Sequence, residues 1–176
     1  MVGDDEEAEV QIEELDADGE VKAQENPEDN STDAEMARVE KEKKGMTAAQ
    51  KLETAAGWKA DGNSFFKKEE IFKAADAYYH AILYSRELLQ NPQYYPDLGH
   101  TEEQRQTAKE LCESCFTNLA LVQLKYGRSF DVSNPERDKV LMEAEKSAGE
   151  ALKVNAQNVK ALFRRGLARA ARAQKT

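Results

Sequence analysis

The apolar residues of this chain recur mainly at helical spacing. Between residues 71 and 89 they stand three or four positions apart, which gathers them on one face of a helix. These residues are Ile71, Ala74, Ala75, Tyr78, Ala81, Ile82 and Tyr84. No alternating strand pattern competes with the helical spacing in residues 47–176. We therefore expect an all-α fold.

Start and stop signals divide this helical part into segments. Thr47 and Thr101 each open a Thr-x-x-Gln capping box, and Asn134 with Pro135 marks a third helix start. The stretch "QNPQYYPDLGH" breaks the pattern with two prolines and a glycine. The predicted helices cover 48–68, 71–89, 102 to about 126, 135 to about 154, and 159 to near the end. Short connections between them predict antiparallel helical hairpins.

Residues 1–46 differ from the rest of the chain in charge and composition. They hold 17 acidic and 5 basic residues, whereas residues 47–176 hold 17 acidic and 20 basic residues. So little apolar surface is available in residues 1–46 that we expect an acidic disordered leader, with a transient helix over 36–44. The overall acidity argues against a nucleic-acid partner. The chain also lacks a signal peptide and an apolar run long enough for a membrane span, so we expect a cytoplasmic or nuclear protein.

The hairpins repeat along the chain. When residue 55 is taken as position 1 of a 34-residue unit, small residues fall at positions 8, 20 and 27 and aromatic residues at 4, 11 and 24. These residues are Gly62, Ala74, Ala81, Trp58, Phe65 and Tyr78. The pattern resembles the tetratricopeptide repeat. The resemblance implies a stacked array of helix pairs in which these positions form the core.

Two further units extend the resemblance over residues 47–176. The second starts near Glu113 and includes an insertion of about 12 residues around "SFDVSNPERD", and the third starts at Val159. Apolar or small residues again occupy the expected positions. These residues are Phe116, Leu119, Ala120, Ala144, Ala148, Ala151, Leu162 and Gly166. We expect two full repeats and the first helix of a third, packed on one side only. Such a chain would be a fragment, a truncated isoform or a form completed by association.

Five polar residues on the first helices of these units resemble the carboxylate clamp of heat-shock co-chaperones. The matching segments are "KADGN", "TNLA" and "KALFRRG". The residues are Lys59, Asn63, Asn118, Lys160 and Arg164. The resemblance implies that they bind the C-terminal Glu-Glu-Val-Asp tail of heat shock protein 90 and heat shock protein 70 chaperones.

The residue types suit such a ligand, because a C-terminal Asp presents two neighbouring carboxylates. Three cations supply charge and two amides add donors, and we expect no acidic side chain nearby. Affinity should be micromolar and should weaken with salt.

Several alternatives to a chaperone adaptor remain. The groove could bind another peptide, or the open third repeat could drive self-association. Among clamp proteins the chain looks most like the FK506-binding immunophilin branch, so it could also be part of a prolyl isomerase. Residues 1–46 are too short and too polar for an isomerase barrel, and we expect no enzymatic activity here.

The other chemical groups give weaker indications. Cys112 and Cys115 form "CESC", but the pair lies within a predicted helix, and His80 and His100 are not at metal-ligand spacing. We expect two reduced cysteines, at least partly buried, and no metal or cofactor. The acidic leader is either a solubilising tail or, through "DDEE" near residue 4, a competitor for the basic groove.

Overall fold

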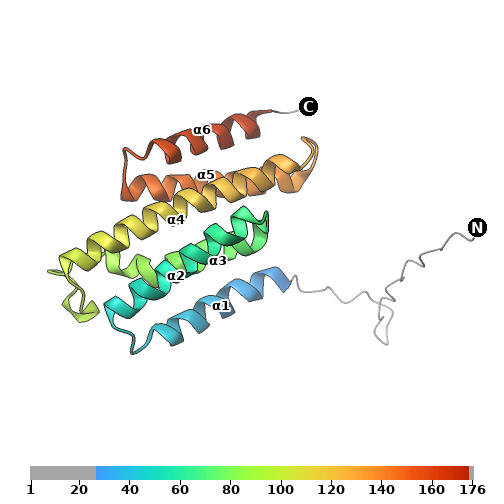
Figure 1. The fold of residues 1–176 in the computed structure, drawn as a ribbon. Helices are drawn as coiled ribbons and strands as arrows, with labels where there is room; N and C mark the ends of the chain where they lie inside the picture. Colours follow the sequence, from blue (N-terminus) through green and yellow to red (C-terminus); the bar gives the residue numbers. More distant parts are fainter. Residues whose placement is uncertain (1–26, 175–176) are drawn as a thin grey trace, which may run out of the picture. The chain divides into compact units, whose positions relative to one another are not determined.

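A computed structural model describes residues 27–174. The chain divides into two units, Met1–Glu35 and Met36–Thr176, and the five predicted clamp residues belong to the second. The described residues form α-helices and two short 3-10 helices, without a β-strand (Figure 1). The elements are α1 (Pro27–Lys43), α2 (Ala48–Lys67), α3 (Ile71–Ser85), η1 (Arg86–Leu89), η2 (Pro96–Leu98), α4 (Glu102–Ser129), α5 (Pro135–Val154) and α6 (Val159–Ala173). The predicted all-α fold is confirmed.

Helices α2 to α6 of the second unit form two antiparallel hairpins and one further helix (Figure 1). Helix α2 packs on α3, and α4 packs on α5. Helix α6 packs on α5 and, less extensively, on α4. Helix α4 also contacts α2, so α2, α4 and α6 follow one another across the unit.

The predicted helix starts are confirmed. Thr47 and Thr101 form complete capping boxes, in which each hydroxyl accepts from the backbone N–H of the third helical residue, at 3.2 Å. Asn134 caps α5, and Pro135 is its first residue. Two helix ends differ from the prediction: residues 86–89 form the 3-10 helix η1, and α4 continues to Ser129.

The core consists of the apolar and small residues that the helical spacing indicated. Tyr78 and Ala81 are almost fully buried, and Trp58 and Phe65 pack partly buried against the same cluster. A Cβ placed at Gly62 would lie 2.8 Å from the Tyr78 ring, so α2 and α3 approach closely there. The absence of a side chain at Gly62 permits this approach.

The structure corrects the predicted boundary at residue 46. Residues 36–43 belong to helix α1, and Val39 is only 1 % exposed within a cluster formed with α2, α3 and α4. Lys43 is also buried and pairs with Glu87 at 3.4 Å. Met36, Val39, Lys43 and Met46 stand three or four residues apart, and the many charges between them hid this stripe. The "DDEE" segment lies outside the described residues.

Candidate functional site

The five predicted clamp residues lie on three neighbouring helices. Lys59 and Asn63 stand one turn apart on α2, and Lys160 and Arg164 stand one turn apart on α6. Asn118 lies on α4, the helix that contacts both α2 and α6. Residues four apart on a helix share a face, so each of these pairs projects from one side of its helix.

Asn63 and Asn118 meet directly, and Tyr78 joins them. The Oδ1 atom of Asn63 accepts a hydrogen bond from the Tyr78 hydroxyl at 2.8 Å and another from Asn118 Nδ2 at 3.3 Å. Both lone pairs of this oxygen are therefore occupied, and the amide orientation of Asn63 is set by its partners. The NH₂ group of Asn63 is left as a donor.

Arg164 reaches the same place from α6. Its Nη1 donates to the backbone carbonyl of Thr117, one residue before Asn118. Partial burial of the guanidinium lowers the pKa of Arg164, and the nearby Tyr78 opposes this shift. Burial raises the pKa of Tyr78, while its interactions with Asn118 and Arg164 lower it. The structure thus brings Asn63, Asn118 and Arg164 together around the Tyr78 hydroxyl.

Two hollows lie along this face and share Asn118. One, of about 240 Å³, lies between α2, α3 and α4, and its lining includes Asn63, Tyr78 and Asn118. The other, of about 460 Å³, lies between α4 and the start of α6, and its lining includes Asn118 and Lys160. Asn118 therefore stands between the α2 side and the α6 side of a groove.

Among the described residues, no hydrogen bond joins Lys59 or Lys160 to the group around Tyr78. Lys160 is exposed and lines the larger hollow. Lys59 is half-buried and lines neither hollow, and its charge acts on the Cys115 thiol beneath it. Hydrogen bonds therefore connect Asn63 with Asn118 and tie Arg164 to the residue before Asn118, whereas the two lysines are linked to the site only by their helices.

The expectation that no acidic side chain lies near the cations is wrong. Glu110 and Glu113 line the same hollow as Lys160. Glu113 accepts hydrogen bonds from Asn155 Nδ2 at 2.9 Å and Asn158 Nδ2 at 2.7 Å, and so holds the turn between α5 and α6. This structural role accounts for the acidic side chain beside Lys160. The end of the groove near α6 therefore contains both acidic and basic side chains.

The sequence did not reveal the part that Tyr78 takes in the site. Tyr78 stands in an apolar stripe and was expected to serve packing alone, although its hydroxyl contacts Asn63, fifteen residues earlier. Nothing in the sequence pairs these two positions, because the contact depends on how α2 and α3 pack. A buried tyrosine in place of phenylalanine is the one available sign, since a buried hydroxyl needs a partner.

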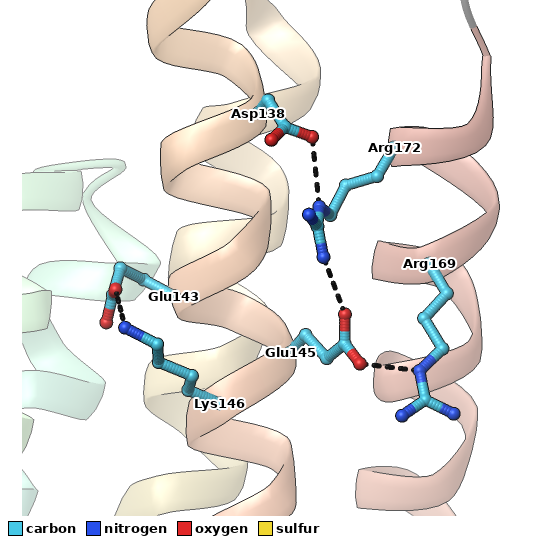
Figure 2. A network of polar contacts seen from close by, with 6 residues as sticks. All are labelled: Asp138, Glu143, Glu145, Lys146, Arg169 and Arg172. Atoms are coloured by element: carbon cyan, nitrogen blue, oxygen red, sulfur yellow. Dashed lines mark hydrogen bonds and ion pairs between the residues drawn. The ribbon is translucent and has the colours of Figure 1, made fainter.

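Helix α6 is held on α5 by a network of ion pairs (Figure 2). Glu145 of α5 accepts from Arg169 Nε at 2.6 Å and from Arg172 Nη1 at 2.9 Å. Arg172 Nε also donates to Asp138 at 2.9 Å. Figure 2 shows Glu145 between the two arginines, and their hydrogen bonds, that of Arg169 above all, lower the pKa of its carboxyl. These contacts fix the helix that carries Arg164.

The two cysteines lie in the core, on α4. Cys112 and Cys115 are free thiols, and both are fully buried. Burial raises the pKa of Cys112 to about 11 and that of Cys115 to about 12. Both thiols are therefore protonated at neutral pH. Redox and nucleophilic reactions of cysteine require the thiolate, so these thiols are poorly suited to them. Among the described residues, no group of three or more His, Cys, Asp or Glu side chains is placed to hold a metal ion.

Comparison of the chain with models of known protein families finds no match. In residues 27–174, no helix combines the length and the apolar character that crossing a bilayer requires.

Proposed function

We propose that this chain is a tetratricopeptide-type co-chaperone adaptor. Its ligand would be the C-terminal Glu-Glu-Val-Asp tail of heat shock protein 90 or heat shock protein 70 chaperones. Binding would occur in the groove between α2, α4 and α6. The proposed location of the protein is the cytoplasm or the nucleus. The contacting residues would be Lys59, Asn63, Asn118, Lys160 and Arg164.

The orientation of Asn63 is the observation that carries this proposal. Its oxygen is occupied by Tyr78 and Asn118, so the free part of the amide is a pair of N–H donors. Donors held in place before a ligand arrives bind a carboxylate with less loss of entropy than freely rotating ones. A carboxylate accepts hydrogen bonds only, so this orientation favours a terminal carboxyl group over a cation or an amine.

Arg164 would supply most of the charge. Its guanidinium is half-buried and already held by the carbonyl of Thr117, so its remaining N–H groups are positioned in a partly desolvated place. Charge-assisted hydrogen bonds are stronger there than in water. Lys160 is exposed and has Glu110 and Glu113 beside it, which would weaken its attraction for an anion. We therefore expect Arg164 to contribute more than Lys160.

A peptide titration tests the proposal. We expect an acetylated Met-Glu-Glu-Val-Asp peptide to bind with a micromolar Kd, and the same peptide with an amidated C-terminus to bind at least tenfold more weakly. Arg164→Ala should weaken binding about tenfold or more, and Lys160→Ala should weaken it less. Lys146→Ala is the matched control, because Lys146 is an exposed lysine on α5 that pairs with Glu143. Equal binding of the acid and amide peptides would contradict the proposal.

Self-association is a second candidate function. Helix α6 exposes Val159, Leu162 and Phe163, with exposed fractions of 75 %, 43 % and 65 %. Space is also open at Gly166, in contrast to the tight contact at Gly62. A second copy covering this face would raise the mass measured by light scattering as concentration rises, and Phe163→Ser should reverse that rise. A constant monomer mass would exclude this function.

Two further alternatives are a groove for another peptide and a part of a prolyl isomerase, and each is tested with its own ligand. A groove for some other peptide would leave the Glu-Glu-Val-Asp peptide unbound while retaining the same donors. We propose no enzymatic activity for the chain itself. A prolyl-isomerase assay on a proline-containing peptide tests that point. Turnover by the purified chain that disappears when one of its residues is substituted would show that the chain is an enzyme.

A further inference from the structure

A further cavity, separate from the two groove hollows, lies on the other side of α4. It has a volume of about 430 Å³ and lies between η1, α4 and the end of α5. Its lining consists of Arg86, Leu89, Arg105, Lys109, Phe116, Glu150, Lys153 and Val154. None of these residues lines the groove hollows. The spacing of Arg105, Lys109 and Phe116 places them on one side of α4, roughly 140–180° around the helix axis from Asn118.

The charges around this cavity are unbalanced. Four of its lining residues are cations and one, Glu150, is an acid. Glu150 is already paired with Lys153 at 2.5 Å. The side chains of Arg86 and Lys109 make no hydrogen bond or ion pair with any residue in the part of the chain that the structure describes. The cavity therefore retains two uncompensated positive charges in a protein that is acidic overall.

Arg105 is held in a fixed position at the same cavity. Its Nε donates to the carbonyl of Leu89 at 2.9 Å, and its Nη1 pairs with Glu102 at 2.7 Å. Its side chain is only 22 % exposed. A guanidinium held in this way on two sides points its remaining Nη2 edge in one direction, which favours recognition of a multi-oxygen anion.

Part of the cavity lining is apolar. Leu89, Phe116 and Val154 are half-buried and line it beside the cations. Ligand cavities commonly combine such an apolar surface with a few polar groups, and this volume lies in their usual range. A bare inorganic anion would leave the apolar part unused, so a ligand with both an anionic and an apolar end fits better.

We propose that this cavity binds a phosphate monoester that carries an apolar or aromatic group. A phosphate monoester has a charge of about −1.5 to −2 at neutral pH, which matches the uncompensated charges of Arg86 and Lys109. Its oxygens would meet Arg86, Arg105 and Lys109, and its organic part would pack on Phe116. The source is either a free phosphate monoester or a phosphorylated side chain of a peptide, since both present the same group.

Isothermal titration with phenyl phosphate tests this site in the full chain. We expect binding that weakens as salt rises, and Kd values at least fivefold higher for Lys109→Ala and for Arg86→Ala. Inorganic phosphate and benzyl alcohol should each bind at least tenfold more weakly than phenyl phosphate. Lys146→Ala, which changes an exposed lysine outside the cavity, should bind phenyl phosphate like the unmodified chain.

Two results would overturn the proposal: no heat of binding at millimolar phenyl phosphate, or a Kd unchanged by both cation substitutions. Arg164→Ala should leave phenyl phosphate binding intact, which separates this cavity from the groove. A phosphotyrosine peptide identifies the source. Binding more than tenfold tighter than phenyl phosphate assigns the site to a phosphorylated peptide, and similar binding assigns it to a free ester.

Discussion

At the residue scale, the proposed function depends on one amide. Asn63 would be a mixed donor and acceptor if its side chain rotated freely, and its sequence context does not orient it. Tyr78 and Asn118 occupy its oxygen and leave its two N–H groups as donors. Tyr78 would thereby be a positioning residue as well as a core residue, because its hydroxyl would act on the proposed ligand only through Asn63.

Replacing Asn63 by Asp tests this arrangement. The carboxylate of Asn63→Asp can still accept from Tyr78 and Asn118, so the fold should be retained. It has no N–H group and it repels an anion, so affinity for the acidic tail peptide should fall at least tenfold. Asn91→Asp is the matched control, because the Asn91 side chain lies in a loop and accepts a hydrogen bond from the backbone N–H of Gln93. Equal peptide affinity of the two variants would contradict the assignment of donors.

The buried thiols give a second prediction at this scale. In the unfolded chain both thiols ionise near pH 9, whereas burial raises the pKa of Cys112 to about 11 and that of Cys115 to about 12. The native state therefore binds more protons than the unfolded state above pH 9, and the free energy of unfolding should fall from pH 9 upward. Urea unfolding at pH 7, 9 and 10 measures this. The fall should be smaller in a Cys112→Ala/Cys115→Ala variant, and an equal fall would assign it to other groups.

At the element scale, α2 carries two glycines with opposite expected effects. A Cβ at Gly62 would lie 2.8 Å from the ring of Tyr78, whereas a Cβ at Gly57 would meet nothing within 4 Å. The first glycine permits the close approach of α2 and α3, and the second only adds backbone entropy to the unfolded chain. Both occupy the interior of one helix, so they form a natural pair of variants.

Alanine at these two positions tests the packing. Gly57→Ala should raise the free energy of unfolding by about 0.5–1 kcal/mol, through helix propensity. Gly62→Ala should lower it by about 1–3 kcal/mol because the Tyr78 ring must move. Displacement of Tyr78 should also weaken binding of the tail peptide. Chemical denaturation of both variants measures the difference, and equal stability would show that α2 and α3 are not closely packed at Gly62.

At the scale of the whole molecule, the last turns of α1 complete the core of the second unit. Val39 is 1 % exposed beside Ala55, Leu83 and Tyr84, which come from α2 and α3. The acidic composition of residues 1–46 predicted disorder up to the start of α2. The structure instead includes residues 36–46 in the folded unit, because a few apolar side chains find a surface to cover there.

Val39→Ala measures this contribution. Removing two buried methyl groups should lower the free energy of unfolding by about 1–3 kcal/mol. Val132→Ala is the matched control, since Val132 is 42 % exposed, and its effect should be within about 0.5 kcal/mol. A small effect at Val39 would show that α1 does not pack on the unit in solution.

The sequence by itself determined the features that depend on interactions between residues close together along the chain. Capping at Thr47, Thr101 and Asn134 and the spacing of apolar residues act within a few positions, so the helices and most of their limits could be predicted. The choice of Asn63, Asn118 and Arg164 as candidate residues also came from the sequence, through its resemblance to the carboxylate clamp.

Only the tertiary structure decided how these parts act together. The contact of Tyr78 with Asn63, the acid at Glu113 beside Lys160, and the burial of Val39 all join residues far apart along the chain. The same is true of the cavity at Arg86 and Lys109, on the opposite side of α4. Each depends on which helix faces meet, and helix faces are chosen by packing over the whole unit rather than by neighbouring residues.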